Sequence, residues 1–484
     1  MPETNESKVK IGNYRWTICA LLFFATAINY LDRQVLSLTW KDFIAPEFHW
    51  TNNDYGNITS LFSIFYAISM LFAGRCVDWL DTKKGFLWAI GIWSVAACLH
   101  AYCGIAASGI LTGQWFVGFK GAKEAISTIG DAGMIINVSV TLFIFARFLL
   151  AFGESGSFPA SIKATAEYFP KKDRAYSTSI FNAGSTVGAL IAPLSIPVIA
   201  AAYGWEMAFL GIGALGFIWM GVWIFLYKKP NVNPKISKNE LAYIQQDNDV
   251  NPTNAQGLPM RKLSFVECFK YKQTWAFAFG KFMTDGVWWF YLFWTPAYLS
   301  SVYGLASDNP TAELLVFVLY AITMLSIIGG WLPSYFVDKK NMNPYAGRMR
   351  AMLMFAFFPL LVLLAQPLGQ YSYWFPIIII GIAGAAHQAW SANIFSTVGD
   401  MFPRSAIATV IGIGGMAGGI GSYFINKGSG MLFDYTEMTN MKFMGFEGIR
   451  SGYFIIFSIC AVAYLIGWVV MKSLVPKYKP ITDY

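Results

Sequence analysis

The sequence has few charged residues. Only 13% of its 484 residues are Asp, Glu, Lys or Arg, and 56% are hydrophobic. Soluble domains average about 25% charged residues, so the composition excludes an ordinary soluble protein and indicates a polytopic membrane protein. The sequence also has only three His and six Cys. The cysteines have no metal-type spacing, and most lie in apolar runs, so we expect neither a disulfide framework nor a metal site.

Long apolar runs dominate the sequence instead. About twelve of them are long enough to cross roughly 30 Å of hydrocarbon as helices. They are too long and uninterrupted for the alternating strands of a barrel, so we expect an all-α integral membrane fold. The expected spans are 16–38, 57–79, 86–108, 139–161, 175–202, 207–227, 274–300, 312–337, 350–368, 372–398, 405–426 and 451–472.

Basic residues gather on alternate loops between these runs. Lys83 and Lys84 follow the second run, a basic stretch at 228–272 follows the sixth, and Lys339 and Lys340 follow the eighth. The positive-inside rule makes these loops cytoplasmic and predicts that both termini lie on the same side. The formal net charge of +8 is therefore read as a topology signal, and we expect no nucleic-acid partner.

The polar stretch after the sixth run divides the chain into two halves. We expect an N-terminal six-helix bundle at 1–227, a cytoplasmic linker at 228–273 and a C-terminal six-helix bundle at 274–484. A second polar stretch, about 108–137, is expected on the extracytoplasmic side. EYFPKKDRA before the fifth run resembles DMFPRSAIA before the eleventh. Such a repeat places a substrate site between the halves.

Two charges in the first run and two in the fourth form the strongest candidate site. Asp32 and Arg33 are adjacent, although a charge at bilayer depth costs roughly 2.5 to 3.5 kcal/mol. Arg147 and Glu154 are seven residues apart and share one helix face. We interpret Asp32, Arg147 and Glu154 as a proton relay, with a static buried ion pair as the alternative. Arg33 points about 100° away from Asp32 and suits a substrate carboxylate; the alternative is that it neutralises Asp32.

Polar and aromatic residues in other runs complete the candidate site. In the seventh run Lys281 and Asp285 are one turn apart, and the alternative to a binding role is mutual neutralisation. Trp289 suits the CH face of a sugar, although 17% of the chain is aromatic and any one ring can face lipid. For His387 the alternative is a hydrogen bond between helices. Besides Arg33, the substrate-binding candidates are Tyr30, Tyr66, Asn182, Lys281, Trp289, His387, Gln388 and Asn393.

Catalytic patterns are missing from the sequence. It has no nucleophile with an adjacent base, no His and Cys cluster and no P-loop. Gly211, Gly213 and Gly216 formally match a dinucleotide-binding fingerprint, but they lie in an apolar run without a preceding strand or a following acidic residue. We therefore expect no enzyme and no cofactor other than protons as a coupling ion.

Several motifs resemble a known family. GRCVDWLDTKK, after the second run, resembles the loop motif of the major facilitator superfamily, although Asp81 stands where a glycine is usual. NYLDR, RFLLAFGESGSFPASIKATAEYFP, FNAGSTVGALIAP and AAHQAWSANIFS are similar to its anion:cation symporter family, and within that family to bacterial hexuronate transporters. The resemblance covers nearly the whole chain apart from 108–137.

The resemblance implies uptake of an organic monocarboxylate with protons across a bacterial inner membrane, by two pseudo-symmetric six-helix bundles. Asp32 and Glu154 would be the protonated carboxylates, Arg147 their partner and Arg33 the substrate anchor. Ser185 stands where galactonate-type relatives have Gln, which favours glucuronate or galacturonate. Galactonate, glucarate and 2-keto-3-deoxy sugar acids stay open as substrates, as do a membrane enzyme and a transporter-like sensor as functions.

The remaining expectations concern partners and conformational change. We expect a monomer in the lipid bilayer that binds a small anionic sugar acid and protons. Residues of the loop motif and of its counterpart in the second half are the gating candidates. These are Gly74, Asp78, Lys83, Lys84 and Asp338.

Overall fold

The computed structural model describes residues 12–246 and 263–481. The long helices of the first half are α1 (Tyr14–Thr39), α3 (Asn52–Leu80), α4 (Thr82–Thr112), α6 (Ala132–Tyr168), α7 (Lys171–Tyr203) and α8 (Trp205–Leu226). The helices that make up the spans of the second half are α11 (Lys272–Tyr303), α12 (Pro310–Thr323), α13 (Ile328–Lys340), α14 (Pro344–Phe357), the short α15 (Ala365–Gly369), α16 (Trp374–Met401), α17 (Arg404–Met438) and α18 (Ile449–Leu474). A hairpin pairs β1 (Lys442–Phe443) antiparallel to β2 (Phe446–Glu447).

Each of the twelve expected spans coincides with one long helix or with two consecutive ones. The eighth and ninth are broken by 3₁₀ turns, η3 (Met324–Ile327) between α12 and α13, and η4 (Phe358–Leu364) between α14 and α15. Within the described ranges, nine helical segments are long and apolar enough to cross a membrane. The other three expected spans are α1 and α11, which carry charged side chains, and the glycine-rich α17.

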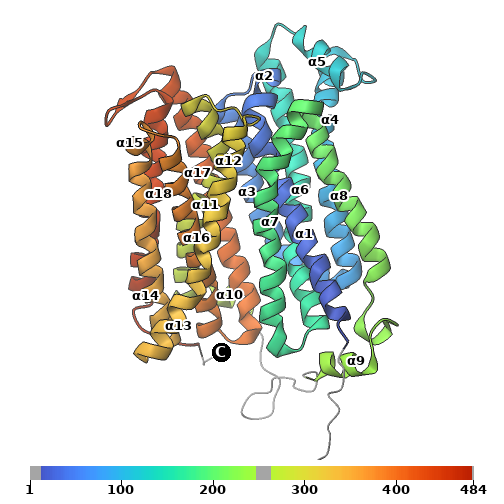
Figure 1. Cartoon of the computed structure of the whole chain (residues 1–484), viewed down its shortest axis with the longest axis vertical. Coiled ribbons are helices and arrows are strands. Elements are labelled where there is room, and N and C mark those ends of the chain that lie inside the picture. The colour runs from blue at the N-terminus through green and yellow to red at the C-terminus, as the bar shows by residue number, and fades with distance from the viewer. Residues whose placement is uncertain (1–11, 247–262, 482–484) are drawn as a thin grey trace, which may run out of the picture.

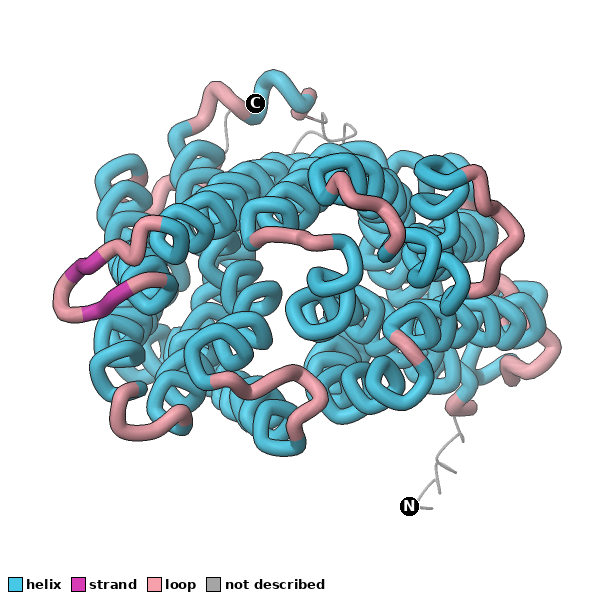
Figure 2. The backbone as a smooth tube through the Cα atoms, turned by 90° about the horizontal axis from the view of Figure 1, so that it is seen from above, coloured by secondary structure: helices cyan, strands magenta, loops and turns pink. Residues whose placement is uncertain are grey.

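The two halves stand side by side (Figure 1). We call one end of the molecule the α5 end; it carries η1 (Trp40–Ile44), α2 (Ala45–Phe48), α5 (Phe119–Ser127) and the hairpin. The opposite α9 end carries the start of α1, the end of α18, α9 (Lys238–Gln245) and α10 (Phe265–Cys268). Figure 2 looks onto the α5 end and shows the hairpin at the rim. Helix α3 packs against α17 between the halves. Helix α1 also contacts α11, and α7 contacts α12.

Glycines bring equivalent helices of the two halves into close contact. A Cβ atom on Gly184 of α7 would lie 2.3 Å from the carbonyl oxygen of Phe23 on α1. In the second half, a Cβ atom on Gly421 of α17 would lie 2.0 Å from the carbonyl oxygen of Phe282 on α11. Small residues allow such backbone contact between membrane helices. The first and fifth spans of each half therefore pack in the same way, as expected for a repeat.

The polar stretch 108–137 and the described part of the linker that contains α9 are attached to the first half. Helix α4 extends to Thr112 and α6 begins at Ala132, so the stretch 108–137 contains helix ends as well as α5. The short helix α9 is tied to the start of α1, because Glu240 accepts from the Arg15 backbone N–H at 3.0 Å and pairs with its guanidinium at 3.4 Å. The linker thus holds the α9 end of α1.

Candidate functional site

A buried ion pair joins α1 to α6. Arg33 Nη2 lies 2.7 Å and Nε 3.1 Å from Glu154 Oε2, so both nitrogens donate to one carboxylate oxygen. The side chain of Glu154 is 0% exposed and that of Arg33 is 8% exposed. Neither charge could remain so deeply buried without its partner, because an unpaired ion in this environment costs several kcal/mol.

Aromatic rings from three helices surround the Arg33 guanidinium. Its central carbon lies 5.2 Å from the ring centroid of Tyr30 on α1, 5.0 Å from that of Tyr66 on α3 and 5.3 Å from that of Trp289 on α11. Distances within about 6 Å permit cation–π attraction. We call Arg33, Glu154 and these three rings the Arg33 cage. Trp289 comes from the second half, so the cage spans the junction predicted from the repeat.

Asp32 and Arg147 are buried beside the cage, with exposures of 1% and 3%. Both carboxylate oxygens of Asp32, and Nη1 of Arg147, are buried without a hydrogen-bond partner among the described residues. The central guanidinium carbon of Arg147 lies 5.3 Å from the Phe62 ring centroid. Within α1, Asp32 and Arg33 therefore have different surroundings.

One detail of the predicted pairing differs from the structure. From the sequence we grouped Glu154 with Asp32 and Arg147 and left Arg33 available to substrate, whereas the Glu154 carboxylate is bound by Arg33. The physical reason is the position of Glu154 on α6, where both Nε and Nη2 of Arg33 reach one oxygen. An anion that binds Arg33 through its Nε and Nη2 donors must therefore displace Glu154.

The charged pair of the second half lies on a single helix. Lys281 Nζ is 2.7 Å from Asp285 Oδ2, and it also lies 4.3 Å from the Phe395 ring centroid. Asp285 fits against α17 because residue 418 is glycine; a Cβ atom there would lie 2.3 Å from Oδ2. The structure thus contains the neutralising pair that was the alternative to a binding role.

The polar candidates of α16 contact other helices. His387 Nδ1 lies 2.8 Å from the Tyr464 hydroxyl, and the His387 ring stacks on Trp288 at 5.3 Å. Asn393 Nδ2 donates to the carbonyl oxygens of Gly329 and Ala389, both at 2.8 Å. These are hydrogen bonds between or within helices. Tyr464 and Trp288 were not predicted, because no pattern distinguishes them from other aromatic residues of the runs.

Two other substrate-binding candidates are not part of the Arg33 cage. Asn182 is exposed on α7, and its carbonyl oxygen accepts from Ser185 Oγ at 2.7 Å. Gln388 is half-buried on α16. The structure therefore brings together Arg33, Tyr30, Tyr66 and Trp289, and it leaves these two outside the Arg33 cage.

The loop after α3 has an unusual backbone at Asp81. Its φ of 69° and ψ of 154° lie in a region that is almost confined to glycine. This explains why glycine is usual at this position in the family that the loop motif resembles. Asp81 Oδ2 pairs with Lys229 Nζ at 3.1 Å. Burial alone would raise the pKa of Asp81, but the Lys229 ammonium and a backbone hydrogen bond from Thr82 bring it below the usual value.

The gating candidates can be placed only in part. Lys83 Nζ donates to the carbonyl oxygen of Ile224 at 2.8 Å, and Lys84 is exposed. Gly74 and the side chains of Asp78 and Asp338 lie outside what the structure describes.

Asp434 of α17 caps the first turn of α3 across the junction of the halves. Its Oδ1 accepts from the backbone N–H of Asn52 at 2.9 Å, and its Oδ2 accepts from that of Asn53 at 2.8 Å. Lys427 Nζ donates to Asn53 Oδ1 at 2.9 Å and also to Asn57 Oδ1. A carboxylate is well placed there, because the N-terminus of a helix carries free N–H groups and a positive dipole end.

Further hydrogen bonds close the same end. Asp42 of η1 accepts from Ser300 Oγ at 2.6 Å and from the backbone N–H and Oγ of Ser307, both at 2.8 Å. The Tyr55 hydroxyl donates to the Phe293 carbonyl oxygen at 2.8 Å. Among groups that the structure describes, all hydrogen bonds between the halves involve residues 42–63 of the first half.

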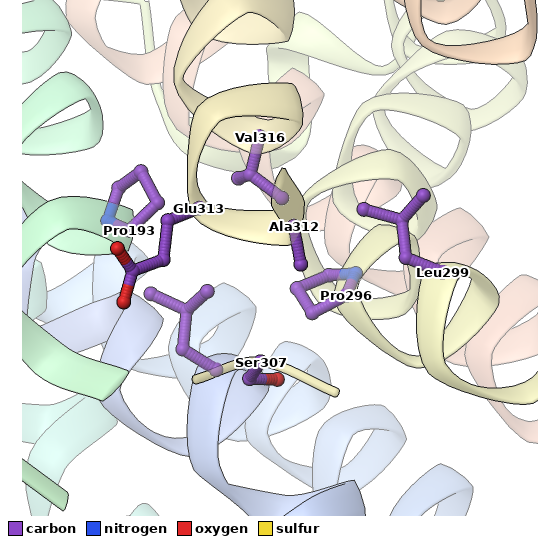
Figure 3. Close-up of a pocket in the computed structure, with 8 residues that line it drawn as sticks. Pro193, Pro296, Leu299, Ser307, Ala312, Glu313 and Val316 are labelled. Atoms are coloured by element: carbon purple, nitrogen blue, oxygen red, sulfur yellow. The ribbon is translucent and has the colours of Figure 1, made fainter. Parts of the chain in front are cut away.

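A small cavity marks this closed junction (Figure 3). It is lined by Leu38 and Pro193 of the first half and, among others, by Glu313 and Ser307 of the second. Its volume of about 10 Å³ holds at most one water molecule, so no sugar acid fits. Asp42, Lys427 and Asp434 were not predicted as site residues, because single polar residues at the ends of apolar runs are common.

Comparison with known proteins agrees with this architecture. Residues 22–425 match the Major Facilitator Superfamily. The chain is 28% identical over 430 residues to the hexuronate transporter of Escherichia coli K12, covering 88% of this chain and 89% of the relative. It is 26% identical over 339 residues to the galacturonate transporter of Dickeya chrysanthemi, covering 70% of this chain and 87% of the relative.

Solved structures share the fold at low sequence identity. A bacterial homologue of the human lysosomal transporter Spinster, in an inward-facing and occupied conformation, superposes with a TM-score of 0.69 at 17% identity, covering 98% of this chain and 100% of that one. A D-xylose–proton symporter superposes with a TM-score of 0.65 at 16% identity, covering 97% and 98%. Together with the apolar helices and the family match, these likenesses establish that the chain is a multi-pass membrane protein belonging to the Major Facilitator Superfamily.

Proposed function

We propose that this protein is a proton-coupled symporter that imports a sugar monocarboxylate, most specifically a hexuronate such as glucuronate or galacturonate. The observation that carries the proposal is the Arg33 cage, in which a buried guanidinium lies among three aromatic rings contributed by both halves. A guanidinium recognises a carboxylate, and aromatic rings suit the CH face of a sugar. The relatives named hexuronate transporter and galacturonate transporter support this substrate class.

Coupling to protons follows from the partner that Arg33 already has. A substrate carboxylate that takes the Nε and Nη2 donors of Arg33 displaces the carboxylate of Glu154. A buried carboxylate without its cation is strongly disfavoured, so Glu154 takes up a proton when substrate binds. Asp32, which is buried near Arg147 and has no hydrogen-bond partner among the described residues, is the proposed second proton site.

Two protons per monoanion would make uptake electrically favourable. Moving one uncompensated anion towards a negative interior costs about 2.3 kcal/mol per 100 mV. One proton cancels that charge, and the second makes the complex positive, so that the membrane potential favours its entry. We propose this stoichiometry from the two buried carboxylates, Asp32 and Glu154.

We propose that transport proceeds by alternating access in a bacterial inner membrane. By the positive-inside rule the α9 end is cytoplasmic, as are both termini, and the α5 end is extracytoplasmic. The hydrogen bonds of Asp42 and Asp434 across the halves belong to a conformation closed to the outside. They must break before substrate enters from that side, and they form again when it leaves to the cytoplasm. The monomer contains one complete Arg33 cage and is the proposed transport unit.

Proteoliposomes test this function. Labelled glucuronate should accumulate when the outside is acidic and the inside is negative, and an uncoupler should stop the accumulation. Competition with unlabelled galacturonate, galactonate and glucarate identifies the preferred acid. Uptake that is unaffected by either gradient contradicts proton coupling. Binding without counterflow indicates a sensor rather than a transporter.

A further inference from the structure

A second cavity lies in the second half at the α5 end. Its volume is about 410 Å³, far larger than that of the cavity between the halves. None of the residues that line it belongs to the Arg33 cage. Those residues are Val302, Tyr303, Gln366, Gly369, Gln370, Tyr371, Ser372, Tyr373, Phe446 and Arg450.

Hydrogen bonds between side chains fix one wall of this cavity. The Tyr303 hydroxyl donates to the carbonyl oxygen of Gly369 at 3.2 Å, and it lies 3.2 Å from the Tyr298 hydroxyl. Buried Gln366 accepts from the Tyr298 hydroxyl at 3.1 Å and donates to the carbonyl oxygen of Arg450 at 3.0 Å. Residue 369 must be small, because a Cβ atom there would lie 2.3 Å from the Tyr303 hydroxyl. The wall is therefore preorganised, as a binding site requires.

The cavity has one cationic group and no carboxylate in its lining. Arg450 Nη2 donates to the carbonyl oxygen of Val302 at 3.1 Å, which orients one edge of the guanidinium, and the residue is otherwise exposed. The nearby hairpin contains Glu447, but Lys442 pairs with it at 2.6 Å. The lining as a whole is therefore cationic and suits an anion.

The rest of the lining suits a polyhydroxylated ligand. Tyr303 and Tyr373 present rings that are 6.3 Å apart and inclined at 76° to each other, and Tyr371 is 83% exposed. The amides of Gln366 and Gln370 offer both donors and acceptors. Aromatic faces, amides, hydroxyls and a single guanidinium are together the chemistry that recognises a sugar monocarboxylate.

We propose that this cavity is a second binding site for a sugar monocarboxylate, on the face where substrate arrives. The inference rests on the proposed function for its ligand class and for its assignment to the extracytoplasmic side. While the junction at Asp42 and Asp434 is closed, this cavity holds substrate outside. Its occupancy raises the local concentration of substrate near the entrance to the Arg33 cage.

The proposal can be tested by measuring how D-glucuronate binds to the purified full-length protein in neutral-lipid nanodiscs. Saturation-transfer NMR at millimolar ligand detects this binding. The double variant Arg33→Gln/Glu154→Gln, which removes both charges of the buried pair, should remove the tight component of binding and leave a weaker one. Adding Arg450→Gln should weaken the remaining glucuronate binding by about tenfold or more, because a charge-assisted hydrogen bond is lost. Adding Gln370→Glu instead should weaken it similarly, because it introduces a charge of the same sign as the ligand. Gln370→Glu is isosteric and exposed, so its effect does not depend on folding. Lys120→Gln, which removes an exposed charge from α5 in the other half of the molecule, is the control and should have no effect.

Two outcomes overturn the proposal. The first is a folded double variant that binds no glucuronate at all. The second is weak glucuronate binding that is unchanged by both cavity variants; if these variants instead bind anionic lipid less tightly, the cavity is a lipid head-group site. Failure of the proposed function is distinguishable, because the wild-type protein would then not transport glucuronate in proteoliposomes.

Discussion

Arg33 of α1 binds Glu154 of α6 through two nitrogens, with a shortest distance of 2.7 Å, and both side chains are buried. The guanidinium that is best placed for a substrate carboxylate is therefore held by a carboxylate of the protein. This competition is the basis of the proposed coupling, because an anion and a proton must arrive together to replace one buried ion pair by another.

Breaking this ion pair should destabilise the protein. Arg33→Gln leaves the Glu154 carboxylate buried without its cation, which costs about 3–5 kcal/mol. The double variant Arg33→Gln/Glu154→Gln removes both charges and should recover most of that loss. Thermal midpoints of the purified proteins in detergent measure both effects. A double variant no more stable than Arg33→Gln would contradict a direct interaction between the two residues.

Replacing the guanidinium while keeping its charge should weaken substrate binding. Arg33→Lys preserves a cation opposite Glu154 but loses the planar fork that binds a carboxylate bidentately. We expect the affinity for glucuronate to fall by about tenfold or more, with little change in the thermal midpoint. Arg350→Lys at the α9 end is the matched control. Unchanged affinity in Arg33→Lys would show that the substrate carboxylate is bound elsewhere.

Loss of the second buried carboxylate should separate uptake from exchange. Asp32→Asn cannot take up the second proton, so the loaded complex is neutral and glucuronate accumulation driven by the membrane potential should be lost. Counterflow, which needs no net proton movement, should remain. Glu124→Gln in the exposed part of α5 removes a carboxylate remote from the site and should transport normally. Full accumulation by Asp32→Asn would exclude this residue from coupling.

The cap that Asp434 places on α3 should control opening at the α5 end. Asp434→Asn keeps the size of the side chain but loses the charge that favours the helix N-terminus, so the closed state should become less populated. Spin labels at exposed His49 and Met438 report the separation of the halves. In Asp434→Asn we expect a larger share of molecules with the longer distance between the labels. Asp54→Asn, which affects a cap within α3 itself, is the control and should leave the distribution unchanged.

The protein should be more stable with glycine in place of Asp81. Its backbone conformation costs a non-glycine residue about 1–3 kcal/mol, whereas the exposed pair with Lys229 contributes at most about 1 kcal/mol. Asp81→Gly should therefore raise the thermal midpoint. Asp81→Asn, which keeps the strained backbone and loses the pair, should not. If both variants lower the midpoint equally, the pair matters more than the backbone.

The membrane fold could be predicted from the sequence because each span needs a long apolar run, and such runs are easily recognised by their length and composition. The importance of Arg33 was also predictable, since a charge within such a run is costly. Its partner was not, because helical periodicity gives the direction of a side chain along one helix but not its distance from a residue on another. Glu154 and Arg147 share a face of α6, and only the packing of α1 against α6 brings Glu154 to Arg33.

Contacts between distant segments were the least predictable features. Asp434 and Asn52 are 382 residues apart, and neither belongs to a recognisable motif. His387 was predicted either to contact substrate or to hydrogen-bond another helix, and its partner is Tyr464 on α18, a residue with no distinguishing pattern. Asp81 is the opposite case: its departure from the usual glycine was visible in the sequence, and the structure supplies the backbone conformation that explains the usual choice.

The most direct test of the account is proton uptake on substrate binding. Purified protein in weakly buffered solution with a pH indicator should take up about one proton or more per glucuronate bound, because Glu154 must be neutralised when Arg33 changes partner. Glu154→Gln should still bind glucuronate but take up about one proton fewer than the wild-type protein. If Glu154→Gln takes up as many protons on binding as the wild-type protein, the exchange of partners at Arg33 is not the coupling step.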